Sequence, residues 1–133
     1  MNQTLEQIKN FHGHLGPYAV IGYKMGKIAN QKLGKDPFGK KATVYTGTTP
    51  PISCIIDGIQ MSSGCTMGKG NIRVENQKKP TADFLDKNGK KISITLKNNI
   101  HDKIDTEIND DNIETFSIKV YEMSDEELFQ IKE

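Results

Sequence analysis

Apolar residues recur at helical spacing near the start of the chain. Leu5, Ile8 and Phe11 lie three residues apart, which predicts a short helix with one apolar face. Threonine is a common helix cap, so we expect this helix to begin at Thr4 and to end near Gly13.

A second, longer helix is predicted over residues 17–33. Its first residue is proline, which is tolerated there because the first-turn amide has no helical partner. Gly16 precedes it as a cap, and Gly34 follows as the stop. Gly22 and Gly26 would let another backbone approach closely, and packing within a globular core is a better explanation of them than a membrane dimer motif. The apolar residues at helical spacing are Tyr18, Ile21, Met25 and Ile28.

Strands dominate the middle of the chain. Stretches that alternate between apolar and polar residues, rich in β-branched side chains, predict them. Asn88 and Gly89 form a typical two-residue turn, which predicts a hairpin. The predicted strands are residues 42–45, 71–75, 81–86, 91–97 and 116–120.

Three further helices are predicted, over residues 52–63, around the isoleucines of residues 100–108, and near the C-terminus. Ser124 and Glu127 have the spacing of a capping box, so a last short helix should follow them. That helix would carry Leu128 and Ile131. This order of elements predicts an α+β fold, with the N-terminal helices packed on a mixed β-sheet.

The composition fits one globular domain of residues 1–133. Charged residues make up 26% of the chain and apolar residues 35%. No stretch is long and apolar enough to span a membrane, and the N-terminus lacks the basic and apolar regions of a secretory signal. We therefore expect no membrane partner and a cytoplasmic location.

Charge is unevenly distributed along the chain. Residues 1–91 carry 14 Lys or Arg against 6 Asp or Glu, whereas residues 92–133 carry 4 against 11. One arginine, no tryptophan and an acidic last third argue against nucleic acid as a partner. Opposite charges in the two regions should neutralise each other within one chain or across a homodimer, which we expect.

Two glycine-rich turns hold most of the reactive side chains. His12 and His14 lie two residues apart in the first turn, and Cys65 lies in the second. Residues two apart in an extended stretch point to the same face, so both histidines could bind one ion. Imidazole and thiolate suit zinc or another divalent transition metal. The sequence thus predicts a metal site of His12, His14 and Cys65, although a surface or capping role for the histidines is an alternative.

Cys54 is a further candidate metal ligand. It lies 11 residues before Cys65, and a helix between them would separate their Cα atoms by roughly 16 Å. One ion could then reach both cysteines only if the helix breaks or a second chain contributes. Cys54 should begin the helix, where the helix dipole lowers the pKa of a thiol. A small buried residue is the alternative interpretation.

Three other residues have candidate roles beside this site. Asp57 and Gln60 share one helix face and could orient metal ligands or face a substrate, or they could be an ordinary surface pair. Lys69 could contact an anion, or it could simply be solvated. Its loop does not match a phosphate-binding loop, because three rather than four residues separate Gly64 from the Gly-Lys pair. We expect no nucleotide binding there.

The two turns resemble the signatures of the formylmethanofuran dehydrogenase E-subunit family. The first match is Phe-His-Gly-His at residues 11–14, followed by a glycine-containing helix at residues 21–26. The second is residues 54–60, followed by Gly-Cys-Thr-x-Gly-Lys-Gly-Asn at residues 64–71. The similarity spans about residues 5–97.

This resemblance implies a fold, a site and a partner. The fold would resemble the C-terminal domain of glyceraldehyde-3-phosphate dehydrogenase, and the metal site would use His12 or His14 with Cys54 and Cys65. The partner would be the molybdenum or tungsten enzyme that reduces CO₂ in methanogenesis. The chain departs from the family at Gly16, where a cysteine is common, and it shows no cysteine-rich C-terminal zinc module.

Three functions remain open at the level of the sequence. The first is a metal-binding accessory protein of that oxidoreductase complex, and the second is a stand-alone zinc-dependent enzyme with an unidentified substrate. The third is a non-catalytic interaction module.

Overall fold

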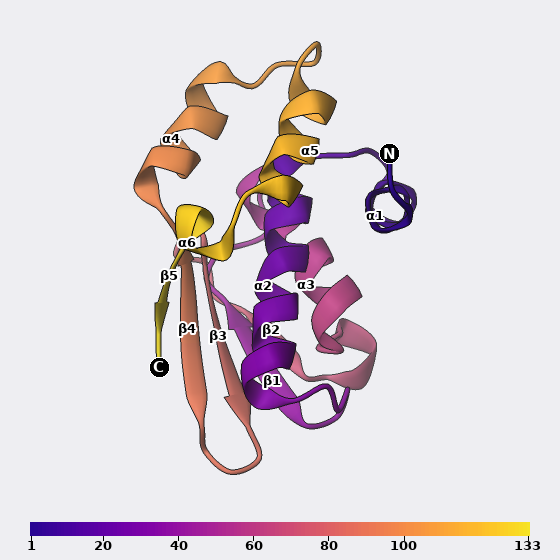
Figure 1. Cartoon of the computed structure of the whole chain (residues 1–133). Helices are drawn as coiled ribbons and strands as arrows, with labels where there is room; N and C mark the ends of the chain where they lie inside the picture. Colours follow the sequence, from indigo (N-terminus) through magenta and orange to yellow (C-terminus); the bar gives the residue numbers. More distant parts are fainter.

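The computed structural model describes residues 1–133 and confirms the α+β class (Figure 1). The α-helices are α1 (Gln3–His12), α2 (Pro17–Leu33), α3 (Ile55–Ser63), α4 (Asn98–Glu107), α5 (Ile113–Glu122) and α6 (Asp125–Leu128). The 3-10 helices are η1 (Ile52–Cys54) and η2 (Met67–Lys69). The strands are β1 (Lys40–Val44), β2 (Ile72–Val74), β3 (Thr81–Asp86), β4 (Lys91–Leu96) and β5 (Phe129–Lys132).

The five strands form one mixed sheet in the order β2-β1-β3-β4-β5. Only β1 and β2 are parallel, as expected for two strands that are joined through a helical crossover, here α3. The hairpin between β3 and β4 is confirmed, with Gly89 at φ 87°. Alternate residues of the central strands, such as Phe84, Ile92 and Ile94, are fully buried. The long helix α2 lies across this buried face of the sheet (Figure 1).

The pairing of α2 with α3 depends on glycines. A Cβ on Gly22 would lie 2.0 Å from the carbonyl oxygen of Ile55, and a Cβ on Gly58 would lie 2.0 Å from that of Ala19. The helices therefore touch backbone to backbone. This confirms that Gly22 serves helix packing inside the chain, and it fixes α3, which carries Cys54 at its start, against the first turns of α2.

Three predicted elements need correction. Residues 116–120 are part of helix α5 rather than a strand, because the buried residues of this segment are Ser117 and Val120, three apart. The capping box of Ser124 and Glu127 is confirmed, but α6 ends at Leu128. The residues after it pair with β4 as the edge strand β5.

The predicted start of the first helix also moves. Its N-cap is Asn2 rather than Thr4, because the Asn2 side chain accepts a hydrogen bond of 2.8 Å from the Leu5 amide. The predicted helix over residues 52–63 is divided into η1 and α3. No helix of the protein has the length and apolar character needed to cross a membrane.

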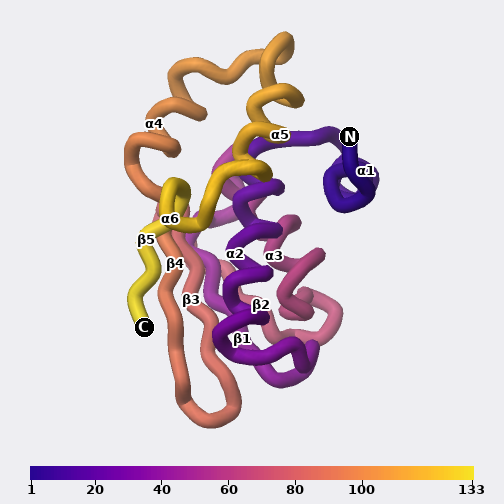
Figure 2. Tube along the Cα trace, viewed as in Figure 1, coloured from indigo at the N-terminus to yellow at the C-terminus, as the bar shows by residue number.

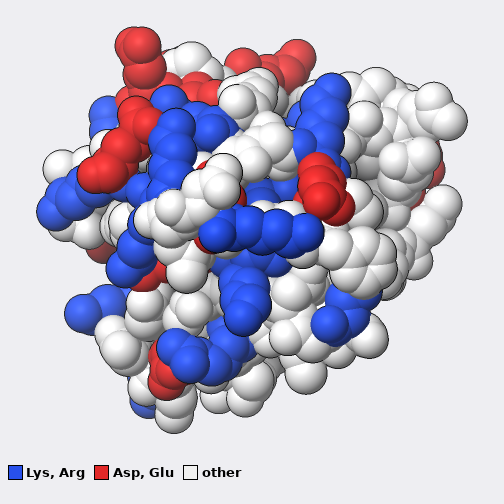
Figure 3. Space-filling view, turned by 90° about the horizontal axis from the view of Figure 1, so that it is seen from below, with Lys and Arg blue, Asp and Glu red and all other residues white.

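The charge asymmetry of the sequence becomes an asymmetry in space. The acidic α4–α5 hairpin stands at one end of the molecule and the β3–β4 hairpin at the other (Figure 2). Lys and Arg side chains spread over much of the surface seen from the β-hairpin end (Figure 3). The molecule is therefore strongly dipolar, although its formal net charge is only +1.

Candidate functional site

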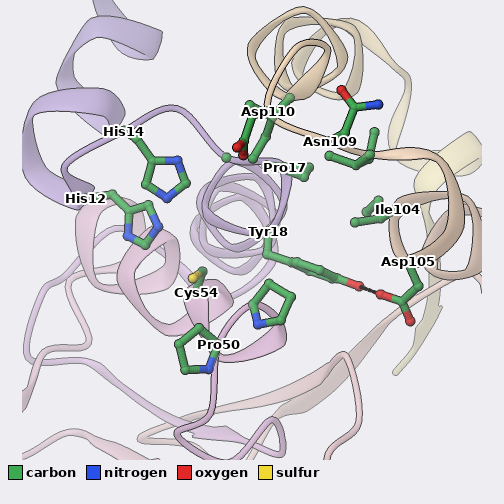
Figure 4. Close-up of a pocket in the computed structure, with 14 residues that line it drawn as sticks. His12, His14, Pro17, Tyr18, Pro50, Cys54, Ile104, Asp105, Asn109 and Asp110 are labelled. Atoms are coloured by element: carbon green, nitrogen blue, oxygen red, sulfur yellow. Dashed lines mark hydrogen bonds between the residues drawn. The ribbon is translucent and has the colours of Figure 1, made fainter.

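A cavity of about 510 Å³ opens between the α1–α2 turn, η1 and the α4–α5 hairpin (Figure 4). One end is formed by His12, His14 and Cys54, and the other by Tyr18 and Asp105. Apolar residues form much of the wall between the two ends. They are Pro17, Pro50, Pro51, Ile104, Ile108 and Ile113.

His12 is the last residue of α1 and is held by a carboxylate from α3. Its Nδ1 lies 2.6 Å from Oδ2 of Asp57. The side chain is only 9% exposed, and its other ring nitrogen, Nε2, is buried without a hydrogen-bond partner. When Nδ1–H donates to the carboxylate, the neutral ring presents Nε2 as a free lone pair. An unpartnered buried nitrogen is rare in proteins and points to a missing ligand.

His14 follows the left-handed Gly13, whose φ of 99° turns the chain at the end of α1. The rings of His12 and His14 lie 4.8 Å apart between centroids, tilted by 37°. His14 is exposed to the cavity. A Cβ on Gly16 would lie 3.1 Å from Cε1 of His14, so a side chain at position 16 would point at this ring. The two predicted histidines thus share one site.

Cys54 ends η1, directly before α3, and its half-buried side chain lines the same cavity. The expectation of a lowered thiol pKa is wrong. Burial raises the pKa of Cys54, and the negative charge of Asp57 raises it further. The partial positive charge of the helix end does not offset these two effects.

Cys65 lies elsewhere. It is fully buried in the hydrophobic core, and its thiol contacts the Lys40 carbonyl oxygen at 3.7 Å. Burial also raises the pKa of this thiol. It does not line the cavity, so the structure does not bring it together with His12 and His14. The reason is local: the turn after α3 packs its small cysteine inward under β1 instead of presenting it to the surface.

Gln60 and Lys69 serve the second glycine-rich turn. The side-chain oxygen of Gln60 accepts a hydrogen bond of 2.9 Å from the Met67 amide. Lys69 donates to the Thr66 hydroxyl at 2.8 Å, and its Nζ lies 5.8 Å from the centre of the Phe38 ring. Neither lines the cavity. Asp57 is therefore the only one of the three supporting residues that contacts a candidate ligand.

A full metal-binding set is not assembled in this arrangement. No three His, Cys, Asp or Glu side chains stand where they could hold one ion together. The free Nε2 of His12 nevertheless lies at the cavity beside a second imidazole and a thiol, which are donors that zinc accepts. The residues present thus fit such an ion, provided that exposed His14 and Cys54 turn towards it.

A polar cluster at the other end of the cavity was missed by sequence reasoning. The Tyr18 hydroxyl lies 2.7 Å from Nδ1 of His101 and donates to Oδ1 of Asp105 at 3.1 Å. Burial raises the pKa of Tyr18, and the carboxylates of Asp105 and Asp102 raise it further. The available signal was a tyrosine inside an apolar helix face, because a buried tyrosine hydroxyl needs a partner.

Comparison with known proteins gives the family. A family model described as FmdE, molybdenum formylmethanofuran dehydrogenase operon, matches residues 11–130. A curated protein of Archaeoglobus fulgidus, named a "probable S-adenosyl-L-methionine-binding protein", is 31% identical over 74 residues. The match covers 54% of this chain but only 20% of that protein, so the chain spans about a fifth of its relative's length.

A solved structure shows the same fold. It is the crystal structure of an FmdE-like protein of tungsten formylmethanofuran dehydrogenase from Syntrophus aciditrophicus, with a TM-score of 0.64 and 19% identity. The match covers 98% of this chain and 69% of that one. Since the family model also spans most of the chain, the chain belongs to the FmdE family, the E-subunit family of formylmethanofuran dehydrogenase.

Proposed function

We propose that this protein is a metal-binding member of its family, with zinc or another divalent transition metal held by His12, His14 and Cys54. The observation that carries the proposal is the buried, unpartnered Nε2 of His12, oriented from behind by Asp57. A carboxylate on the far nitrogen is the usual support of a metal-binding histidine, since it fixes the ring and its tautomer.

The other two ligands can complete the set. His14 is exposed and makes no hydrogen bond within the chain, so its ring can turn towards His12 at little cost. The Cys54 thiol is protonated at neutral pH in this surrounding, and a bound cation would displace its proton. Cys65 is not included, because its thiol is sealed in the core.

Three protein ligands would leave a coordination position open to the cavity. Gly16, which has no side chain to offer there, stands against His14. An open position is typical of reactive rather than purely structural zinc sites. The metal would supply Lewis acidity, while His12, His14 and Cys54 would fix it at one end of the cavity.

Two roles are compatible with such a site. Family membership favours an accessory protein of a molybdenum or tungsten formylmethanofuran dehydrogenase, whereas the open position favours a stand-alone zinc-dependent enzyme. Co-purification of the tagged chain from its own host separates them, because an accessory protein brings the catalytic subunits with it. A non-catalytic interaction module is the alternative if no metal binds. We also propose the likeness to the C-terminal domain of glyceraldehyde-3-phosphate dehydrogenase, which a superposition of the two sheets tests.

The direct test of the site is metal analysis of protein purified without a histidine tag. The two cysteines give a matched pair of variants, Cys54→Ala and Cys65→Ala. We expect nearly one metal ion per chain in the parent and in Cys65→Ala, and very little in Cys54→Ala and His12→Ala. Circular dichroism confirms that each variant is folded.

Two results contradict the proposal. One is a parent that retains no metal and takes up none from added zinc. The other is equal metal in all four proteins. Loss of metal in folded Cys65→Ala, with retention in Cys54→Ala, would move the site to the second glycine-rich turn.

A further inference from the structure

The cavity that holds His12 has an unusual charge distribution at its opposite end. The chain contains 18 Lys and Arg residues, but none of the 14 residues that line the cavity is a lysine or arginine. The charged groups that face it from the α4–α5 hairpin are the carboxylates of Asp105 and Asp110. The neighbouring side chain of Asn109 is neutral. An anionic group placed here would meet repulsion without any compensating cation.

Tyr18 prepares one of these carboxylates for binding. Its buried ring lies along the cavity floor, and its hydroxyl points at Asp105 (Figure 4). The hydroxyl donates to Oδ1 of Asp105 at 3.1 Å, while Oδ2 lies 3.5 Å from Nε2 of His101. Asp105 is thus oriented on two sides by groups from α2 and α4. A carboxylate that is held in place loses less entropy when it binds a ligand.

Asp110 supplies a second, free carboxylate. It follows α4 in the loop to α5 and is exposed. It makes no hydrogen bond or ion pair within the chain, whereas the next residue, Asp111, does not line the cavity at all. The two aspartates that face the cavity are therefore available as acceptors from two positions on its rim.

The remainder of the cavity suits an apolar body. Between the two ends lie Pro50, Pro51, Ile104 and Ile108. At the far end, the nine-tenths-buried His12 presents its unpartnered Nε2. The cavity thus offers two carboxylates, an apolar middle and a lone-pair donor in sequence. A bare inorganic cation would leave the apolar middle unused.

We propose that this cavity binds an organic cation, with an ammonium-type group between Asp105 and Asp110 and an apolar body against the prolines and isoleucines. The proposal names the ligand class of the site described under Proposed function and rests on that cavity, although it does not require the metal. An amine with a compact ring or chain is the matching chemistry. Carboxylates and phosphates are the classes that the cavity rejects.

A series of three probes with one scaffold and different charge tests this. Tyramine is cationic at pH 7, 4-hydroxyphenylethanol is neutral and 4-hydroxyphenylacetate is anionic. Binding is followed by ¹⁵N-edited NMR titration of chelator-treated protein, because a carboxylate can also ligate a bound metal. We expect tyramine to bind about tenfold more tightly than the alcohol, a modest gain for a partly exposed ion pair, and the acid to bind least.

Matched variants assign the preference to the two carboxylates. In Asp105→Asn/Asp110→Asn, the affinities for tyramine and the alcohol should agree within about twofold. Asp111→Asn removes a carboxylate from the adjacent residue outside the cavity and should retain the full preference. The shifted amide signals should come from residues around Tyr18 and the α4–α5 loop.

Several results would overturn the inference. They are equal or tighter binding of the acid, a preference that survives in the double variant, or no binding of any probe at 20 mM, a concentration on the order of a very weak fragment's Kd. Metal content is measured on the same preparations before chelation. A parent without metal but with the amine preference refutes only the metal proposal, and a metal-bound parent without the preference refutes only this inference.

Discussion

Asp57 decides which nitrogen of His12 faces the cavity. Its carboxylate accepts the Nδ1 proton at 2.6 Å and leaves Nε2 buried and free. We predict that Asp57→Asn lowers metal affinity by about 10- to 100-fold, the usual effect of losing a carboxylate behind a histidine ligand. Competition with a chromophoric chelator measures the change.

Gln60 provides the control for that prediction. It lies on the same helix, but its side chain accepts a hydrogen bond from the Met67 amide and does not reach the cavity. Gln60→Ala should therefore bind metal like the parent. An unchanged affinity in Asp57→Asn would mean that the pair of His12 and Asp57 only stabilises the junction between α1 and α3.

Asp83 is a second carboxylate whose neighbours determine its ionisation. Burial raises its pKa, but the hydrogen bond from Tyr45 and the charge of Lys91 outweigh burial, so the pKa lies below its ordinary value. The Tyr45 hydroxyl donates to Oδ2 at 2.6 Å. A lowered pKa means that this stabilisation is complete above the unfolded pKa of about 4 and is lost as the pH falls through the folded pKa.

We predict that Tyr45→Phe lowers the free energy of unfolding by about 1–2 kcal/mol at pH 7. The difference from the parent should shrink as the pH falls below about 4, because Asp83 is then protonated in both proteins. Urea unfolding at a series of pH values measures it. Tyr23→Phe is the control, since the Tyr23 hydroxyl makes no hydrogen bond within the chain. A difference that is constant with pH would assign the effect to packing.

At the scale of elements, the contact between α2 and α3 positions the metal end of the site. Gly58 lies where α2 crosses, and a Cβ there would lie 2.0 Å from the Ala19 carbonyl oxygen and 2.3 Å from the Tyr23 amide nitrogen. Both are backbone atoms, which cannot move aside without separating the helices. The start of α3 carries Cys54 and Asp57, so separation would displace both.

We predict that Gly58→Ala destabilises the protein by about 3 kcal/mol, at the upper end for overpacking, and that it weakens metal binding. Gly68→Ala is the matched control. It lies in η2, and an added Cβ there would meet nothing within 4 Å, so its effect should stay within about 0.5 kcal/mol. Thermal unfolding and metal analysis of both variants give the answer. Similar stabilities would show that the helices can shift apart freely.

Element prediction from the sequence succeeded where local chemistry determines the structure. Gly13, Gly34 and the capping box at Ser124 mark real helix ends. It failed at residues 116–120, where apolar residues alternate but the buried positions follow helical spacing. It also failed at β5, because a four-residue edge strand exists only through pairing with β4, which no local pattern encodes.

The site was predictable in its residue types but not in its grouping. His12, His14 and Cys54 do share a cavity. The choice between Cys54 and Cys65, however, depends on which thiol the packing of α3 buries. The cluster of Tyr18, His101 and Asp105 joins residues more than 80 positions apart. Its formation depends on where the α4–α5 hairpin folds back, which neither segment reveals alone.

At the scale of the whole molecule, the separation of charge bears on self-association. The glycines of α2 do not support the expected homodimer, because α3 already occupies that face. The opposite charges of the two ends still do. Lys and Arg dominate the view from the β-hairpin end (Figure 3), and the acidic α4–α5 hairpin forms the other end (Figure 2). Two copies related by a twofold axis and aligned antiparallel would place each acidic end against a basic end, in a closed arrangement.

We therefore predict a homodimer whose stability depends on salt. Attraction between exposed charges is screened beyond about 10 Å at 0.1 M salt and beyond about 3 Å at 1 M, so a dimer formed at low salt should dissociate towards monomers as salt is raised. Light scattering coupled to size exclusion, at 20 mM and 1 M potassium chloride as the low and high ends of that screening range, measures the mass at about equal protein concentration. A monomer in both conditions ends the prediction. A dimer in both would require an interface that is mainly apolar, and the charged ends would then have no part in assembly.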